Sequence, residues 1–175
     1  MTYVFDASPL VVLATAERLD LLAHFEECLL TERVHAEVVE AGREHGYPDA
    51  NRIARGIDEG VLMVREVEAD DQFRSFAAVD GLSEGDASTL ALAAQADATA
   101  IMDETIGRDV AGVHGIETRG TAFLVLSLVR DDELLPDEGR TVIDEMVDAG
   151  WYCSTELYRK IERKIDAIEA GTDEK

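Results

Sequence analysis

The chain has 175 residues, which is enough for one domain with a sizeable core. It carries 38 Asp and Glu residues against 16 Lys and Arg, a formal net charge of −22, and 46% of its residues are hydrophobic. This hydrophobic content argues against disorder. The charge argues against a membrane-surface role and against a basic nucleic-acid groove in dilute salt. We therefore expect a folded protein with an acidic surface of the halophilic type, screened by molar salt.

The apolar runs and the two cysteines favour a cytoplasmic protein. The longest apolar run, residues 10–14, is too short to span a bilayer, and no signal peptide is evident. Cys28 and Cys153 lie far apart and match no metal-ligand spacing. We read both as reduced thiols of a cytoplasmic protein without a membrane segment.

Short apolar runs alternate with helical patterns along the chain, which favours an α/β fold with a parallel central sheet. Strands are predicted over residues 3–5, 28–31, 61–67, 99–103 and 113–118. Helices are predicted over residues 9–16, 17–25, 33–41, 50–58, 70–79, 84–96, 108–111, 120–130, 141–149 and 154–170. No linker divides the chain, so we expect a single domain over residues 1–175 with the last helix at about 154–170.

Two predicted strands end in an aspartate. Asp6 follows the run Tyr3-Val4-Phe5, with Ser8 as the expected N-cap and Pro9 as the first residue of the next helix. Asp103 ends the fourth predicted strand. Parallel strands share one carboxyl edge, where ligands bind, so both side chains are expected there, and close together if the strands are neighbours. The alternative for each is a solvated loop residue or a helix cap.

Two more acids belong to predicted helices. At about 100° per residue, Glu37 lies roughly 60° from the centre of the apolar face that Val34 and Val38 mark, so it is placed to reach inward. It could instead extend to solvent at the rim of that face. Asp86 ends Ser83-Glu84-Gly85-Asp86, the spacing of a capping box. It can cap its helix and also project toward the sheet edge.

A cluster of carboxylates predicts a metal. Several ionised carboxylates in one pocket raise each other's pKa, and a divalent cation relieves this cost. Oxygen ligands suit Mg²⁺ or Mn²⁺, and such a site performs phosphodiester hydrolysis. The four histidines show no ligand spacing and are taken as structural or surface residues: His24, His35, His45 and His114.

The order and spacing of several segments resemble the PIN-domain family, and within it the VapC-like toxin ribonucleases. The segments that carry this resemblance are residues 6–10, 34–39, 82–87, 101–104 leading to Arg108, 120–126 and 150–158, and it covers roughly residues 1–160. It implies a Mg²⁺- or Mn²⁺-dependent endoribonuclease with a three-layer α/β/α fold. It also implies a parallel five-stranded sheet of order 3-2-1-4-5.

The resemblance also assigns residues to the site. It implies catalytic roles for Asp6, Glu37, Asp86 and Asp103, metal ligands among Asp6, Asp86, Asp103 and Glu104, and supporting polar roles for Ser8, Arg108 and Thr121. One departure matters, because the branch commonly has two consecutive Asp after the fourth strand and the second is Glu104 here. Which of Asp103 and Glu104 reaches the metal stays open.

The leading hypothesis is the RNA-cleaving toxin of a toxin–antitoxin pair, with RNA as substrate and a small antitoxin as partner. The amphipathic helices at 120–149 and 154–170 also suggest a homodimer. Three alternatives remain: a phosphatase or DNA nuclease with the same acids, a PIN fold that has lost activity and only binds, and a phospho-acceptor signalling domain. The last needs a Lys near the final strand, whereas the first Lys is Lys160.

Overall fold

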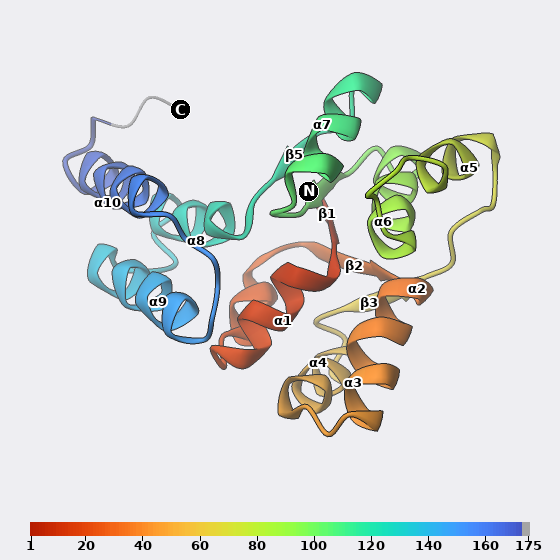
Figure 1. Ribbon diagram of the computed structural model, residues 1–175. Coiled ribbons are helices and arrows are strands. Elements are labelled where there is room, and N and C mark those ends of the chain that lie inside the picture. Colours follow the sequence, from red (N-terminus) through yellow and green to blue (C-terminus); the bar gives the residue numbers. More distant parts are fainter. Residues whose placement is uncertain (173–175) are drawn as a thin grey trace. The chain divides into compact units, whose positions relative to one another are not determined.

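The computed structural model describes residues 1–172 and divides the chain into two compact units, Met1–Gly120 and Thr121–Lys175 (Figure 1). Each unit is described by itself. The single domain expected over residues 1–175 stays a prediction. No helix among residues 1–172 is both long and apolar enough to cross a membrane.

The first unit is built on a five-stranded parallel sheet of order β3-β2-β1-β4-β5. The strands are β1 (Thr2–Phe5), β2 (Glu27–Thr31), β3 (Met63–Arg65), β4 (Thr99–Ile101) and β5 (Thr118–Arg119). β1 lies at the centre, and Val4 and Phe5 have no exposed surface. Helices flank the sheet in a three-layer α/β/α arrangement, so the predicted fold class and strand order are confirmed.

The turn after β1 differs from the sequence prediction. Helix α1 (Ala7–Thr15) begins directly after Asp6, so Ser8 is not its N-cap and Pro9 is its third residue. The reason lies in the sheet, because the Asp6 backbone N–H still donates to Ile101 O at 3.0 Å and β1 pairing reaches this residue. Asp6 becomes the N-cap residue, but its carboxylate makes no capping hydrogen bond. Its carboxylate therefore stays available for other contacts.

The segment after β2 is one helical run with three hydrogen-bonding patterns. It comprises α2 (Glu32–His35), a π-helix η2 (Ala36–Ala41) and α3 (Gly42–Glu44). Thr31 caps the run as predicted, because its Oγ1 accepts from Val34 N at 3.1 Å. The sequence left two ends open for this helix, Gly42 or a turn that reaches Gly46. The second is observed, because α3 ends at Glu44 and the turn after it closes at Gly46, in the left-handed region at φ +76°. Helix α4 (Pro48–Asp58) follows.

The remaining helices of this unit are η1 (Leu19–His24), α5 (Asp71–Ala77), α6 (Glu84–Gln95) and α7 (Thr105–His114). α6 packs against β1, β2 and β4. The short helix at 108–111 and the strand at 113–118 were wrong, because α7 runs on to His114 and β5 has only two residues. Ala111 packs on the core from α7, and Ile116 packs on it from the turn after that helix. The apolar run alone does not distinguish this arrangement from a strand.

The second unit is described for residues 121–172 and contains α8 (Thr121–Arg130), α9 (Pro136–Asp148) and α10 (Thr155–Glu169), which pack pairwise. The predicted cap of the last helix is confirmed, because Ser154 Oγ accepts from Leu157 N at 3.1 Å. α9 begins five residues before the predicted position 141. Pro136 starts it, and Glu138 accepts from Leu135 N at 2.8 Å, which stabilises this early turn.

Gly139 permits the close approach of α9 to α8. A Cβ at this position would lie 2.5 Å from Val129 Cγ2, and β-branched valine has little freedom to move away. Gly139→Ala should therefore lower the free energy of unfolding by about 1–3 kcal/mol despite its better helix propensity. Gly112→Ala is the matched control, because nothing lies within 4 Å of its Cβ. It should raise the free energy of unfolding by up to about 1 kcal/mol. Chemical denaturation compares the two, and equal stabilisation by both would contradict the close packing.

Candidate active site

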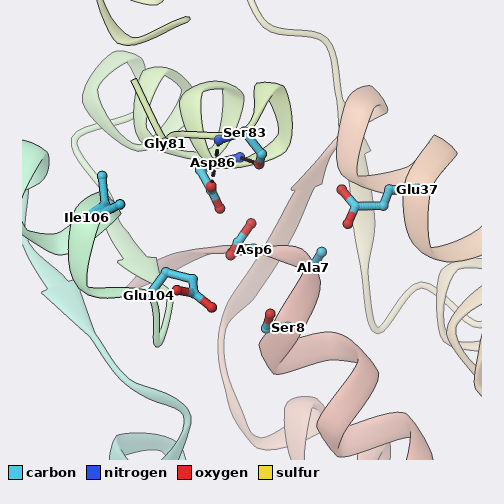
Figure 2. Close-up of a pocket in the computed structure, with 10 residues that line it drawn as sticks. Asp6, Ala7, Ser8, Glu37, Gly81, Ser83, Asp86, Glu104 and Ile106 are labelled. Carbon is cyan, nitrogen blue, oxygen red and sulfur yellow. Dashed lines mark hydrogen bonds between the residues drawn. The ribbon is translucent and has the colours of Figure 1, made fainter. Parts of the chain in front are cut away.

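A pocket lies at the carboxyl end of the sheet, where acids from four separate segments meet (Figure 2). The residues that line it are Asp6, Ala7, Ser8, Glu37, Gly81, Ser83, Asp86, Glu104, Ile106 and Gly107. Four of these ten carry a carboxylate and none is basic. The position is the one expected for ligand binding in an open parallel sheet.

Asp6 is the most enclosed of these acids, with 3% of its surface exposed. Burial is the main cause that raises its pKa, from 3.8 to about 8. The charge of Asp86, a hydrogen bond with Asp86 and the charge of Glu37 raise the pKa further, while the Ala7 backbone N–H lowers it. Without a cation, burial and the neighbouring acids therefore favour the protonated form of Asp6.

Asp86 has two roles at once. Its Oδ2 accepts from Ser83 N at 2.9 Å, and its own N–H donates to Ser83 Oγ at 3.0 Å, so the predicted capping box is confirmed. The same side chain points toward Asp6 (Figure 2). The capping interaction holds the Asp86 carboxylate at the start of α6, and this orients it toward the end of β1.

Glu37 reaches the pocket from the π-helix. It keeps much of its surface in solvent, yet its pKa is raised, first by partial burial of the carboxylate and then by the charge of Asp86. Its Oε2 would lie 3.0 Å from a Cβ built on Gly85. The i→i+5 pattern of η2 alters the angular spacing that α-helical reasoning assumes, and such π turns are frequent at functional sites. No feature of the sequence indicated this turn.

Asp103 and Glu104 take different positions. Glu104, the N-cap residue of α7, lines the pocket, whereas Asp103 lies outside its lining. Asp103 Oδ1 would lie 2.9 Å from a Cβ built on Gly120. Asp6 thus bonds to Asp86 and feels the charge of Glu37, and Glu104 is the acid that the segment after β4 brings to the pocket.

The other predicted polar residues are distributed unevenly. Ser8 lines the pocket from the first turn of α1. Arg108 is exposed on α7, outside the lining. Thr121 is buried at the start of the second unit. The sequence prediction missed Ile106 and Gly107 as pocket residues, because it began the helix at residue 108. The Glu104-Thr105 pair, where α7 starts, was the available signal for an earlier helix start.

The acids suit a divalent cation although they are not gathered as a complete ligand set. Within residues 1–172, no group of three or more Asp, Glu, His or Cys side chains is close enough to hold a metal ion. Asp6 and Asp86 are in contact, however, and no basic side chain lines the pocket to balance them. A buried carboxylate in contact with a half-buried one, with only oxygen donors, fits Mg²⁺ or Mn²⁺.

Comparison with known proteins gives one match. A sequence model of the DUF3368 family, described as a PIN domain, matches residues 2–167. No curated protein and no solved structure gives a significant match. The matched residues include all five acids discussed above and span both compact units.

Proposed function

The chain belongs to the PIN-domain family, which has a nuclease fold, and from this premise we propose that it is a Mg²⁺- or Mn²⁺-dependent endoribonuclease. The observation that carries the proposal is the pairing of buried Asp6 with Asp86 in a pocket without a basic residue. Such a pair is costly unless a cation compensates it. We take RNA as the substrate, in line with the VapC-like motifs of the sequence.

The chain's own residues divide the chemistry among them. Asp6 and Asp86 would hold the cation, with Glu37 and Glu104 at the rim and Asp103 behind them. The bound cation supplies a more acidic water and binds phosphate oxygens. Glu37, whose pKa is raised, accepts a proton from the attacking water. Ser8 and the first backbone N–H groups of α1 line the same pocket and favour a phosphate group there.

The biological setting is also a proposal. We propose that the protein is a cytoplasmic toxin that a small antitoxin protein restrains, and that it forms a homodimer. An apolar surface on α7 supports a protein partner, because Val113 is 85% exposed and Ile106, at the pocket, 45% exposed. Both free cysteines, Cys28 and Cys153, agree with a reducing compartment.

The decisive experiment compares substrates and metals. Purified protein is incubated with labelled RNA, and with DNA of the same sequence, in molar KCl with Mn²⁺, Mg²⁺ or a chelator. We expect internal RNA cleavage that the chelator abolishes. Preferential DNA cleavage would support the DNA-nuclease alternative. Metal binding by calorimetry without cleavage of either polymer would favour a metal-binding module without nuclease activity, and the absence of both would favour a PIN fold that has lost its activity.

Gly85 tests the position of Glu37. Gly85→Ala places a methyl group 3.0 Å from Glu37 Oε2 and 3.5 Å from Ser83 Oγ, so the Glu37 carboxylate must move. A misplacement of this size should slow RNA cleavage roughly 10- to 100-fold. The melting temperature should change little, since the end of a glutamate side chain moves easily. Gly112→Ala serves again as control, and an unchanged cleavage rate in Gly85→Ala would remove Glu37 from the reaction.

A further inference from the structure

The acid pocket shares Glu37 with a groove beside the π-helix, and we propose that an unpaired base of the RNA stacks in this groove on Tyr47. The inference rests on the proposed ribonuclease function. Glu37 lines both the acid pocket and this groove. Small apolar side chains of α1 and η2 also border the groove, namely Val11, Val38 and Ala41, and Asp49 of α4 adds a second carboxylate beside Tyr47. A strand whose phosphate lies at Asp6 could thus place a neighbouring nucleotide in the groove.

The aromatic surface of the groove is a stacked pair. The rings of His45 and Tyr47 have centroids 5.8 Å apart and planes inclined by 14°. His45 is exposed, and Tyr47 is 56% exposed, so neither ring serves the core. His45 Nδ1 donates to Ala41 O at 2.7 Å, which fixes the imidazole against the end of the helical run. The pair therefore offers a flat aromatic surface to solvent.

The backbone holds Tyr47 in place. Gly46 N donates to Arg43 O at 3.0 Å and Tyr47 N donates to Gly42 O at 2.9 Å, the two bonds of a Schellman motif. Gly46 has the positive φ that this motif requires. Pro48 then starts α4 and restricts Tyr47 to its extended backbone, with φ −73° and ψ 125°. A ring ordered in advance loses little conformational entropy when a base stacks on it.

The charge of the protein favours a base over the phosphate backbone as the occupant. The net charge is −22, and neither the acid pocket nor the groove is lined by Lys or Arg. Contacts to phosphates would also weaken steeply in the molar salt that this acidic chain suits. Stacking on an aromatic ring involves no net charge and tolerates any base. The geometry therefore points to an unpaired base, rather than a phosphate group, as the occupant of the groove.

The test measures RNA binding apart from cleavage. In an Asp6→Asn background, which should not cleave, the Kd of fluorescein-labelled single-stranded RNA is measured by anisotropy in molar KCl. Tyr47→Ala and Tyr47→Leu should each weaken binding roughly 5- to 100-fold, and Tyr47→Phe should bind like the parent. Tyr152→Ala is the control, because Tyr152 is 88% exposed and does not line the groove. Melting curves confirm that each variant is folded.

The same substitutions in the otherwise unchanged enzyme separate the two proposals. Tyr47→Ala should raise KM more than it lowers kcat. With an RNA that contains abasic sites, the unchanged enzyme and Tyr47→Ala should have the same KM. If the enzyme cleaves RNA and Tyr47→Ala changes neither Kd nor KM, the stacking site is overturned and the ribonuclease stands. If the unchanged protein neither binds nor cleaves RNA, both proposals fail.

Discussion

Asp6→Asn should abolish RNA cleavage, with a loss of more than about 100-fold. Losing a residue that only supports a metal ligand costs up to about 100-fold in activity, and Asp6 is proposed to hold the metal directly. The amide is a poorer ligand for Mg²⁺ than a carboxylate, and it cannot balance the cation's charge. The fold should remain, since the Asp6 carboxylate makes no capping bond and its backbone N–H bond to Ile101 O is unaffected. Without metal the variant should even be more stable near neutral pH, because a buried acid with a raised pKa has been removed.

The control for this substitution is Asp97→Asn. Asp97 is exposed and has a left-handed backbone at φ 51°, which asparagine adopts readily, so the exchange of carboxylate for amide is the same but lies outside the pocket. Cleavage with Mn²⁺ in molar KCl should be unchanged in Asp97→Asn. Cleavage by Asp6→Asn at the rate of the unchanged protein would exclude Asp6 from the site.

The second large effect concerns pH. The folded pKa of Asp6 is about 8, above the unfolded value of 3.8. The folded protein therefore binds the extra proton between these values, and without metal its stability should fall as pH rises through this window and level off above about pH 8. The loss should be on the order of a few kcal/mol. A bound cation replaces the proton, so stabilisation by Mg²⁺ should grow with pH over the same window.

Melting temperatures measured from pH 5 to 9 at fixed molar KCl, with and without Mg²⁺, test this expectation. Other carboxylates titrate as well, so the informative quantity is the difference between the unchanged protein and Asp6→Asn. The variant should show a shallower pH slope without metal and a smaller gain from Mg²⁺. Parallel curves for the two proteins would show that Asp6 neither holds a raised pKa nor contributes to cation binding.

Individual strands and helix caps could be predicted from the sequence where a few neighbouring residues decided the local structure. The run Tyr3-Val4-Phe5 before Asp6 predicted a short buried strand with an acid at its end, and Ser83 with Asp86 predicted a capping box. The strand order 3-2-1-4-5 was different in kind. It came from the family resemblance and not from the apolar pattern, which says nothing about which strands are neighbours.

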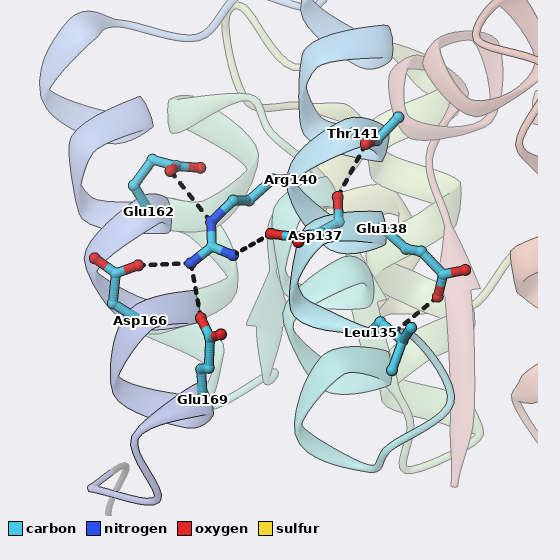
Figure 3. A network of polar contacts seen from close by, with 8 residues as sticks. All are labelled: Leu135, Asp137, Glu138, Arg140, Thr141, Glu162, Asp166 and Glu169. Carbon is cyan, nitrogen blue, oxygen red and sulfur yellow. Dashed lines mark hydrogen bonds and ion pairs between the residues drawn. The ribbon is translucent and has the colours of Figure 1, made fainter.

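Interactions between distant segments could not be predicted in this way. Figure 3 shows Arg140 on α9 surrounded by four acids, one on its own helix and three on α10. The N–O distances are 3.0 Å to Asp137, 3.5 Å to Glu162, 2.6 Å to Asp166 and 3.2 Å to Glu169. Only the pair with Asp137 has a helical spacing that sequence reasoning can recognise. The other three depend on how the two helices pack.

The candidate site shows the same division. The sequence alone determined that Asp6 and Asp103 follow strands and that Asp86 belongs to a capping box, because these features are set by neighbouring residues. Tertiary structure decided which of them meet. Pairing of β1 with β4 started α1 at Ala7 and left the Asp6 carboxylate uncapped, the π-helix turned Glu37 toward Gly85, and the start of α7 brought Glu104 to the pocket. The pairing of β1 with β4 joins residues far apart in the chain, and no local pattern contains the energy of such a contact.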